Sequence, residues 1–423
     1  MGIIKKENLS QKKLEQYYEY CRIIQWGRRF PCKFAEEFLG VEFMDFQRYV
    51  FMNSWDKQFV LWLMSRNAGK CLKLDTRIPT PNGDKTMADI KVGDYVFNEE
   101  GKPVKVIHVS PIYLDKECYE VEFEDGEIIT ATNDHLWEVS DRRSRQWCNH
   151  GIPFILTTEE MYKKGVYKDR KDGKGREYNY RVPMNKPLEY KEKEFKINPY
   201  VLGLWLGDGS HSDTSITAHK DDYEEINSYI KYYGFNTSVH KDNGRNTYTI
   251  RIVKDKNSDK NKFKQSLIEY NLFKNKHIPE EYLYGSYKQR LQLLQGLMDT
   301  DGTCKNKKSN NPECSFSQKR YKIVKQFEKL LSSLGIKYST RVKKTRCNGK
   351  EFESYEVRFY TDKTKPCFKM KRKYDLLPEK LNKRMDRKTI VDIRKVTTVA
   401  TKCIMVEGER NLYLCGNVFN YNY

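Results

Sequence analysis

Two matched segments, Val201-Leu-Gly-Leu-Trp-Leu-Gly-Asp-Gly209 and Leu294-Gln-Gly-Leu-Met-Asp-Thr-Asp-Gly302, decide the fold of the central part of this chain. Each is an apolar run of helical length with two small residues four positions apart: Gly203 and Gly207, and Gly296 and Thr300. Small residues at this spacing form a smooth stripe, so two such helices can approach backbone to backbone. If the segments pack in this way, Asp208 and Asp301 lie side by side. Carboxylates so close together need a proton or a cation between them.

The segments that follow the two acidic residues also repeat. Each copy continues with a short strand, a helix closed by glycine, a hairpin that turns at Asn-Gly, and an alternating strand. These parts are residues 215–217, 223–234, 243–244 and 247–253 in the first copy, and 315–317, 321–335, 348–349 and 355–360 in the second. A duplicated α/β unit of this length predicts two pseudo-symmetric halves.

These motifs resemble the LAGLIDADG homing endonucleases over residues 199–365, including the lead-in Ile278-Pro-Glu-Glu-Tyr282 before the second motif. The resemblance implies an α+β endonuclease of two αββαββ-type halves, residues 199–277 and 278–365, within a domain of residues 196–375. It also implies two antiparallel sheets that form a saddle over the major groove of double-stranded DNA, with the motif helices at the centre.

The same resemblance assigns site residues. Asp208 and Asp301 would be the catalytic residues that bind Mg²⁺ between the protein and the scissile phosphates, since hard oxygen ligands suit this ion. Lys276, just before His277-Ile-Pro279, is a candidate for polarising the attacking water or the phosphate. Basic residues on the strands would contact DNA: Arg251, Arg341, Lys343, Lys344, Arg346 and Arg358.

The composition of the whole chain favours a nucleic-acid partner. Its 423 residues carry a net charge of +20, with 78 Lys and Arg and 30 Tyr, a balance that suits a polyanion. No apolar run approaches the roughly 18 residues that a membrane span needs. Eleven scattered Cys without a C-x-x-C pair argue against a disulfide framework and a zinc ribbon. We therefore expect a reduced, cytoplasmic protein that acts as a monomer and has no membrane partner.

Residues 1–70 have the character of a different protein. The apolar strand Phe59-Val-Leu-Trp-Leu-Met64 leads directly into Ser65-Arg-Asn-Ala-Gly-Lys70, which is half of a P-loop. This segment resembles the ATPase of phage terminase large subunits, with Gln47 at the position of their adenine-contacting glutamine.

The resemblance to an ATPase is incomplete. Gly69 and Lys70 would bind nucleotide phosphates, but only after splicing has restored the host protein. Met64 stands at the position of the first P-loop glycine, and Cys71 stands where Ser or Thr should follow the lysine. Because no Walker B strand follows either, this chain is not expected to hydrolyse ATP as it stands.

From Cys71 onward, short strands and tight turns replace the helical pattern. The clearest hairpin is residues 119–132, which alternates on both sides of Asp125-Gly126. With the initial Cys71 and with Thr132-Asn-Asp-His135, this region resembles the N-terminal part of an intein, the all-β Hint domain. Residues 390–416 resemble the C-terminal part. The implied Hint domain therefore comprises residues 71–195 and 376–423, split by the endonuclease.

The intein resemblance gives these residues chemical roles. The thiol of Cys71 would attack the carbonyl of Lys70, an N-to-S acyl shift that forms a thioester. His135 is the candidate acid that protonates the departing nitrogen, since imidazole titrates near neutral pH. Thr132 would hold the scissile peptide by its backbone, and Cys403 matches a position that assists the later steps. None of these steps requires a cofactor.

The C-terminal sequence departs from the intein pattern. Inteins normally end in His-Asn, whereas this chain ends in Phe419-Asn-Tyr-Asn-Tyr423. If Asn422 is the cyclising residue, Tyr421 replaces the helper histidine and Tyr423 is the following residue, a poor acyl acceptor. If Phe419 instead aligns with the family's aromatic residue, the cyclising Asn has no assigned position. Thioester formation at Cys71 is therefore expected, and complete splicing is left open.

The sequence thus predicts an intein with an embedded homing endonuclease, preceded by the start of a phage terminase ATPase, in the host cell of a phage. Its double-stranded DNA target would be the uninterrupted terminase gene. Two alternatives stay open. One is a DNA-packaging ATPase that is active only after splicing, and the other is a DNA-binding remnant that has lost cleavage or splicing.

Overall fold

The computed structural model describes residues 10–40, 45–54, 71–141, 153–170, 173, 175–242, 245–305, 312–347, 350–381, 387–408, 412–416 and 418–421. They belong to two compact units, residues 1–65 and 66–423. Among the helices described, none is both long enough and apolar enough to cross a membrane.

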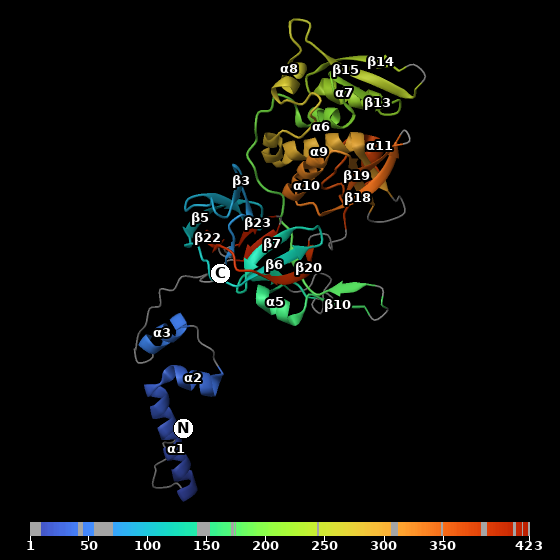
Figure 1. Cartoon of the computed structure of the whole chain (residues 1–423). Coiled ribbons are helices and arrows are strands. Elements are labelled where there is room, and N and C mark those ends of the chain that lie inside the picture. Colours follow the sequence, from blue (N-terminus) through green and yellow to red (C-terminus); the bar gives the residue numbers. More distant parts are fainter. Residues whose placement is uncertain are drawn as a thin grey trace. The chain divides into compact units, whose positions relative to one another are not determined.

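The first unit is helical in its described part. Its helices are α1 (Gln11–Arg29), α2 (Pro31–Leu39) and α3 (Asp45–Ser54) (Figure 1). The chain packs closely where α1 meets α2, because a Cβ at Gly27 would lie 2.6 Å from the ring of Phe34. The predicted strand 59–64 and the predicted nucleotide-binding residues Gly69 and Lys70 lie outside the described residues, as does the side chain of Gln47.

The second unit begins and ends with a β-domain. Before the central insertion its elements are β1 (Leu72–Lys73), β2 (Arg77–Thr80), β3 (Gly83–Thr86), β4 (Tyr95–Phe97), β5 (Pro103–Val109), β6 (Cys118–Phe123), β7 (Ile128–Thr132), β8 (Leu136–Val139), β9 (Phe154–Thr157), α5 (Thr158–Lys164), β10 (Tyr167–Asp169), β11 (Arg176–Tyr178) and β12 (Arg181–Pro183). After the insertion they are β20 (Arg387–Val396), β21 (Thr401–Lys402), β22 (Ile404–Val406), β23 (Leu412–Cys415) and β24 (Val418–Tyr421).

Strands from both ends of this unit share the same sheets. The largest sheet has the order β12-β20-β6-β7-β1-β21, and two smaller ones have the orders β23-β24-β8-β9 and β22-β5-β4. The predicted hairpin around Asp125-Gly126 is confirmed, because β6 pairs with β7 in antiparallel register and Gly126 takes the positive φ of 82° that the turn needs. Buried side chains such as Trp137 and Tyr413 form the core of this domain.

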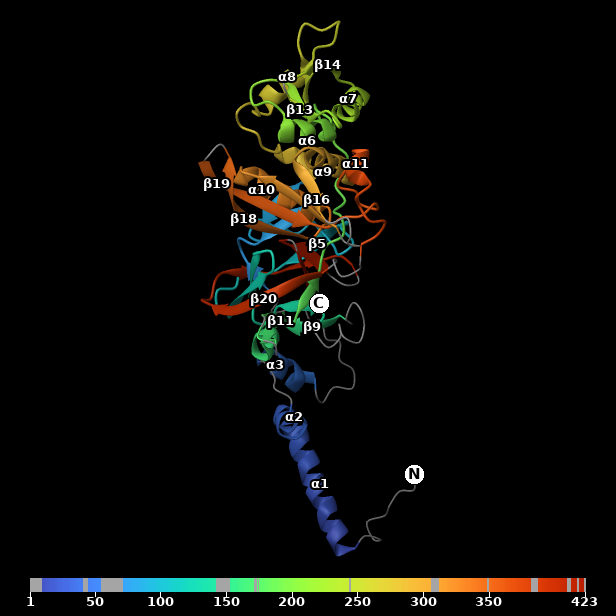
Figure 2. The same cartoon turned by 90° about the vertical axis from the view of Figure 1, so that its right-hand side faces the viewer.

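The central insertion is an α+β domain (Figures 1 and 2). Its first half contains α6 (Pro199–Asp208), β13 (Ser215–His219), α7 (Tyr223–Tyr232), β14 (Asn236–Lys241), β15 (Thr247–Val253) and α8 (Lys262–Glu269). Its second half contains η2 (Glu280–Tyr284), α9 (Tyr287–Asp301), β16 (Gly302–Lys305), β17 (Glu313–Gln318), α10 (Tyr321–Ser333), β18 (Tyr338–Cys347), β19 (Lys350–Phe359) and α11 (Lys371–Tyr374). The two sheets have the orders β13-β15-β14 and β16-β17-β19-β18.

The second half follows the predicted αββαββ order, and the first half departs from it. Where the second half has strand β16, the first half has only an isolated bridge between Gly209 and Ile216. The connection before β13 is short and bent. The Asp213 carboxylate accepts a hydrogen bond from Ser215 N at 2.8 Å, and the backbone carbonyl of Asp213 accepts one from Trp205 Nε1 at 3.1 Å. The chain therefore returns to the sheet too soon to form a second strand.

The predicted close packing of the two motif helices is confirmed. α6 and α9 lie next to each other in both views (Figures 1 and 2). A Cβ on Gly296 would lie 2.2 Å from the carbonyl oxygen of Tyr200 and 2.9 Å from the Cα of Gly203, so a larger residue would force the helices apart. A Cβ on Gly207 would lie 2.1 Å from the hydroxyl of Thr300. The contact therefore follows the small-residue stripe to the C-terminal ends of both helices.

Candidate functional site

The acidic ends of α6 and α9 form the first candidate site. Asp208 and Asp301 are the last residues of the two helices, and the contact at Gly207 brings them together, since a Cβ there would lie 3.5 Å from Asp301 Oδ2. Burial raises the pKa of Asp208 above its usual value. Burial, and then the charge of Asp208, raise the pKa of Asp301 to about 6. Two carboxylates that oppose each other's ionisation favour a cation between them.

The donor chemistry of this pair fits a hard divalent cation. Mg²⁺ is commonly held by one or two carboxylates and by the phosphates of its substrate. Over the described parts of the chain, no group of three or more His, Cys, Asp or Glu side chains is placed to hold a metal ion. A cation held by Asp208 and Asp301 would therefore take its other ligands from water and from DNA.

Two lysines, the buried Lys276 and the partly buried Lys373, cap the two helices in the same way. Lys276 Nζ donates to three carbonyl oxygens at the end of α6, those of Leu206, Gly207 and Gly209, at 3.1, 3.0 and 2.6 Å. Lys373 Nζ donates to four at the end of α9, those of Met298, Asp299, Thr300 and Gly302, at 3.0, 2.7, 3.3 and 2.9 Å. Burial lowers the pKa of Lys276 to about 8 and also lowers the pKa of Lys373.

Lys276 was predicted from the sequence to lie at this site, and Lys373 was not. A weak signal was present, because each lysine precedes an apolar-Pro-Glu segment, at residues 278–280 and 377–379. Two further polar contacts were also missed. Gln318 donates to Asp301 Oδ2 at 3.3 Å, and Arg320 Nη2 lies 3.3 Å from His211 Nδ1.

The residues predicted to bind DNA divide into three groups in the structure. Arg251 lies on β15, where it donates to Ser215 Oγ at 3.2 Å and approaches Asp213 at 3.5 Å. Arg341, Lys343 and Arg358 of the second half all form ion pairs with Glu356, a residue that the sequence analysis did not single out.

The remaining two predicted DNA contacts lie elsewhere. Lys344 pairs with Glu353 one position beyond Lys343, so strand alternation places it on the opposite face of the sheet from Lys343. It is therefore not part of the array around Glu356. Arg346 pairs with Glu351 in the same hairpin, but its side chain lies outside the described residues.

A second candidate site surrounds Cys71 in the β-domain. The backbone N–H of Cys71 donates to Thr132 Oγ1 at 3.1 Å, and the backbone N–H of Thr132 donates to Cys71 O at 3.0 Å. The hydroxyl of Thr132 donates in turn to Asp134 Oδ1 at 2.7 Å. Cys71 N belongs to the peptide bond predicted to break, so Thr132 holds that bond and Asp134, missed by the sequence analysis, orients the hydroxyl.

His135 and Cys403 lie in the same region of the β-domain. His135 is fully buried, and its ring meets that of Trp137 edge to face with centroids 5.0 Å apart. The thiols of Cys71 and Cys403 share a hydrogen bond. This bond, together with burial, raises the pKa of Cys71 well above that of an ordinary thiol. Cys71 is therefore a neutral thiol at rest, and it needs a base or a proton acceptor before it can act as a nucleophile.

The C-terminal strand returns to this second site. Tyr421, the last residue of β24, pairs with Leu136, which directly follows His135. The backbone N–H of Cys403 donates to Ser110 Oγ at 2.9 Å, which fixes the start of the returning segment. Asn422, the candidate cyclising residue, lies outside the described residues. The fold thus brings residues 71 and 421 to one end of the β-domain.

Comparison with known proteins supports an assignment for part of the chain. Residues 288–368 match the family model of the LAGLIDADG-like domain. A curated relative, the replicative DNA helicase DnaB of Mycobacterium intracellulare, is 32% identical over 362 residues, which make up 82% of this chain and 57% of the relative. A second, from Mycobacterium leprae, is 37% identical over 83 residues, 20% of this chain and 14% of the relative. The chain spans little more than half of the first relative and a small part of the second.

Two kinds of solved structure are similar to parts of the chain. The MchDnaB-1 intein is 38% identical, with 21% of this chain and 58% of that chain covered and a TM-score of 0.17. The meganuclease I-SmaMI, solved with DNA, is 18% identical, with 40% of this chain and 79% of that chain covered and a TM-score of 0.25. These relatives are named as helicases, inteins or nucleases. The terminase assignment of residues 1–70 therefore has no support from them.

Proposed function

We propose that the central domain is a Mg²⁺-dependent endonuclease that cuts double-stranded DNA. The observation that carries this proposal is the meeting of Asp208 and Asp301 at the ends of two helices that pack through glycine. The match of residues 288–368 to the LAGLIDADG-like domain supports it independently.

In the proposed reaction, Asp208 and Asp301 hold the divalent cation, which supplies Lewis-acid polarisation of the scissile phosphate. Lys276 and Lys373 neutralise the carbonyl ends of the two helices, which would otherwise repel the phosphate. Basic side chains on the two sheets hold the duplex across both halves. DNA is cut at the point where the two halves meet.

The test uses a duplex that carries the host gene without this insertion. Full-length protein with Mg²⁺ should cut both strands of this duplex, and Asp208→Asn and Asp301→Asn should bind it without cutting. A protein that binds DNA in the presence of Mg²⁺ but never cuts it would instead favour the alternative of a DNA-binding remnant.

We also propose that the β-domain carries out the first step of intein-type splicing. The supporting observation is the Thr132 hydrogen bond to Cys71 N, at the end of the domain to which Tyr421 also returns. In this step Cys71 Sγ attacks the carbonyl carbon of Lys70 and the thiol gives up its proton. The bond from that carbon to Cys71 N breaks, a thioester forms, and His135 supplies a proton to the released amine, so that in net one proton moves from sulfur to nitrogen.

An added thiol tests the splicing proposal directly. Dithiothreitol should release a fragment that ends at Lys70, detected by intact mass, and Cys71→Ala should abolish the release. If the wild-type chain stays intact, or if Cys71→Ala releases the same fragment, the proposal is wrong.

The interrupted host is part of the proposal. We propose a P-loop ATPase, either a phage terminase, as the sequence resemblance implies, or a replicative helicase, as the names of the curated relatives suggest. The homing target would be the same gene without the insertion. The reading frame on both sides of the insertion distinguishes the two hosts.

A further inference from the structure

Glu356 holds three cations on the open face of the second sheet. Arg341 Nε and Arg358 Nε approach Glu356 Oε2 at 2.5 and 2.7 Å, and Lys343 Nζ binds the other oxygen. The Glu356 side chain is only 3% exposed, whereas that of Arg341 is 47% exposed. Burial alone would raise the pKa of Glu356, but hydrogen bonds from Lys343 and Arg341 outweigh it and hold the pKa below its ordinary value.

The orientation of this array follows from strand alternation. Glu356 and Arg358 alternate on β19 with Val357 and Phe359, which are fully buried in the hydrophobic core of the endonuclease domain. The array therefore lies on the face that is not packed against α10. Under the proposed function, this is the face that meets DNA.

The way in which the two arginines bind Glu356 determines what they can recognise. Both use Nε, so neither ion pair occupies the terminal amino groups of the guanidinium. A guanidinium fixed in this way presents two parallel N–H donors, which match O6 and N7 of guanine in the major groove. A flexible arginine would bind phosphate just as well, and phosphate contacts carry no sequence information.

The first half lacks this array at the equivalent positions. Arg251 is the counterpart of Arg358, because each of them pairs with a serine on both neighbouring strands. Two residues earlier on the same strands, Thr249 therefore stands at the position of Glu356. Its strand partner His240 stands at the position of Arg341. Asp242 accepts hydrogen bonds from the hydroxyls of Thr247 and Thr249 at 2.7 and 2.8 Å, and it holds no cation array. The two halves therefore present different chemistry to DNA.

We propose that Glu356 is a specificity-determining residue that fixes Arg341 and Arg358 to read guanines in the half-site facing the second half. This inference rests on the proposed function. It requires a stronger guanine preference in the half-site facing the second half than in the other, where Arg251 is retained at the position of Arg358 but Thr249 and His240 replace Glu356 and Arg341.

The experiment selects DNA from a randomised duplex library with full-length protein. The parent protein carries Asp301→Asn, which prevents cutting, and Glu356→Gln and Arg341→Lys are added to it separately. Glu353→Gln is the matched control, because Glu353 is exposed on the same strand and faces the opposite side. Each bound pool is sequenced, and each protein's thermal transition is measured.

The parent and the control should select guanines more strongly in one half-site than in the other. Glu356→Gln and Arg341→Lys should each lower that preference roughly 5- to 150-fold, the range for loss of a bidentate arginine–guanine contact. Removing the Glu356 charge should also steepen the plot of log binding constant against log salt concentration for random duplex, by about one additional phosphate contact. Arg341→Lys should leave that slope unchanged. Because Arg341→Lys keeps its charge on an exposed side chain, it provides the test even where Glu356→Gln fails to fold.

Three outcomes would overturn the inference. If the parent selects a sequence without a guanine preference, or if the guanine preference persists in both Glu356→Gln and Arg341→Lys, the role of Glu356 is overturned and the endonuclease proposal stands. A parent protein that enriches no sequence at all overturns both.

Discussion

At the scale of single residues, the ionisation of Asp301 links the stability of the protein to pH. Its pKa of about 6 in the folded chain lies above the usual value near 4, because of burial and the charge of Asp208. Between these two values the folded protein binds more protons than the unfolded chain. Stability is therefore lost as pH rises through this window, and the loss is complete above about pH 6.

A metal-free melting experiment tests this linkage. From pH 5 to pH 7 the wild-type thermal midpoint should fall relative to that of Asp301→Asn by a few degrees, on the order of 1–2 kcal/mol. Mg²⁺ should reverse the difference at pH 7, because a cation between the carboxylates stabilises their ionised forms. Parallel pH profiles for the two proteins would show that the pKa of Asp301 is not raised in the folded chain.

The capping lysines give a second prediction at this scale. Lys276→Met and Lys373→Met should each slow DNA cutting by about tenfold or more while binding is retained, because each removes a charge beside the reacting phosphate. Lys371→Met is the control, since the Lys371 side chain is largely exposed on α11 and pairs with Asp375 one turn away. Single-turnover cutting rates would measure the effect, and equal rates for all three variants would rule out a role for the caps in cutting.

The sequence carries only a weak signal for the second of these two lysines. Lys276 lies two residues before Ile278-Pro279, whereas Lys373 lies four residues before Leu377-Pro378, so the two copies do not align by spacing. The two lysines are equivalent because their Nζ atoms bind the carbonyl oxygens at the C-terminal ends of α6 and α9. The spacing of the lysines along the chain does not reveal these contacts.

At the scale of elements, the motif helices were predictable, and the surface proposed to face DNA was not. Small residues four apart showed where α6 and α9 touch, because backbone-to-backbone contact leaves no room for a larger side chain at these positions. The full length of α9, which begins seven residues before Leu294, is marked by a capping box of Ser286 and Gln289. By contrast, a basic run such as residues 341–346 does not show which side chains share a face, since that depends on strand register.

The helix contact can be tested at Gly296. A methyl group there would lie 2.2 Å from the carbonyl oxygen of Tyr200, so Gly296→Ala should destabilise the domain by about 1–3 kcal/mol despite the higher helix propensity of alanine. Lys288→Ala, at an exposed position of the same helix, should leave the thermal midpoint nearly unchanged. If Gly296→Ala is as stable as Lys288→Ala, the helices do not pack through this stripe.

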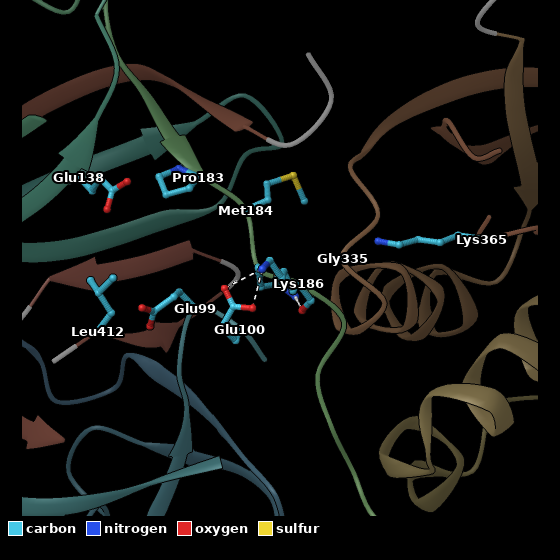
Figure 3. Close-up of a pocket in the computed structure, with 10 residues that line it drawn as sticks. Glu99, Glu100, Glu138, Pro183, Met184, Lys186, Gly335, Lys365 and Leu412 are labelled. Carbon is cyan, nitrogen blue, oxygen red and sulfur yellow. Dashed lines mark hydrogen bonds and ion pairs between the residues drawn. The ribbon is translucent and has the colours of Figure 1, made fainter. Parts of the chain in front are cut away.

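At the scale of the whole second unit, the β-domain and the central α+β domain meet through a partly buried ionic contact. Asp84 of β3 binds Arg77 at 3.0 Å and Lys329 of α10 at 2.9 Å, and Arg77 also donates to Gly416 O at 2.8 Å. Residues of both domains line a pocket in which Glu100 and Lys186 pair with each other on one side and Lys365 points toward them from the other (Figure 3). None of these pairings could be predicted, because the partners come from distant segments with ordinary surface composition.

Lys329 gives the prediction that belongs to this contact. Lys329→Ala removes one of the two cations beside the largely buried Asp84 carboxylate and should destabilise the unit by roughly 1–3 kcal/mol. Lys322→Ala, at an exposed position of the same helix, is the control. Denaturant unfolding of the full chain would measure both, and equal midpoints would mean that the contact adds no stability.

The two proposed activities should be separable, because their residues lie in different cores. The buried residues around α6 and α9 form one hydrophobic core, and those around β6 and β7 form another. Asp208→Asn should therefore abolish DNA cutting and leave thiol-dependent release at Cys71 unchanged, and Cys71→Ala should do the reverse. Both activities can be measured on the same preparation of full-length protein. If Asp208→Asn also slowed the release at Cys71, the ionic contact at Asp84 would be the first route to examine, and combining Asp208→Asn with Lys329→Ala would show whether the coupling passes through it.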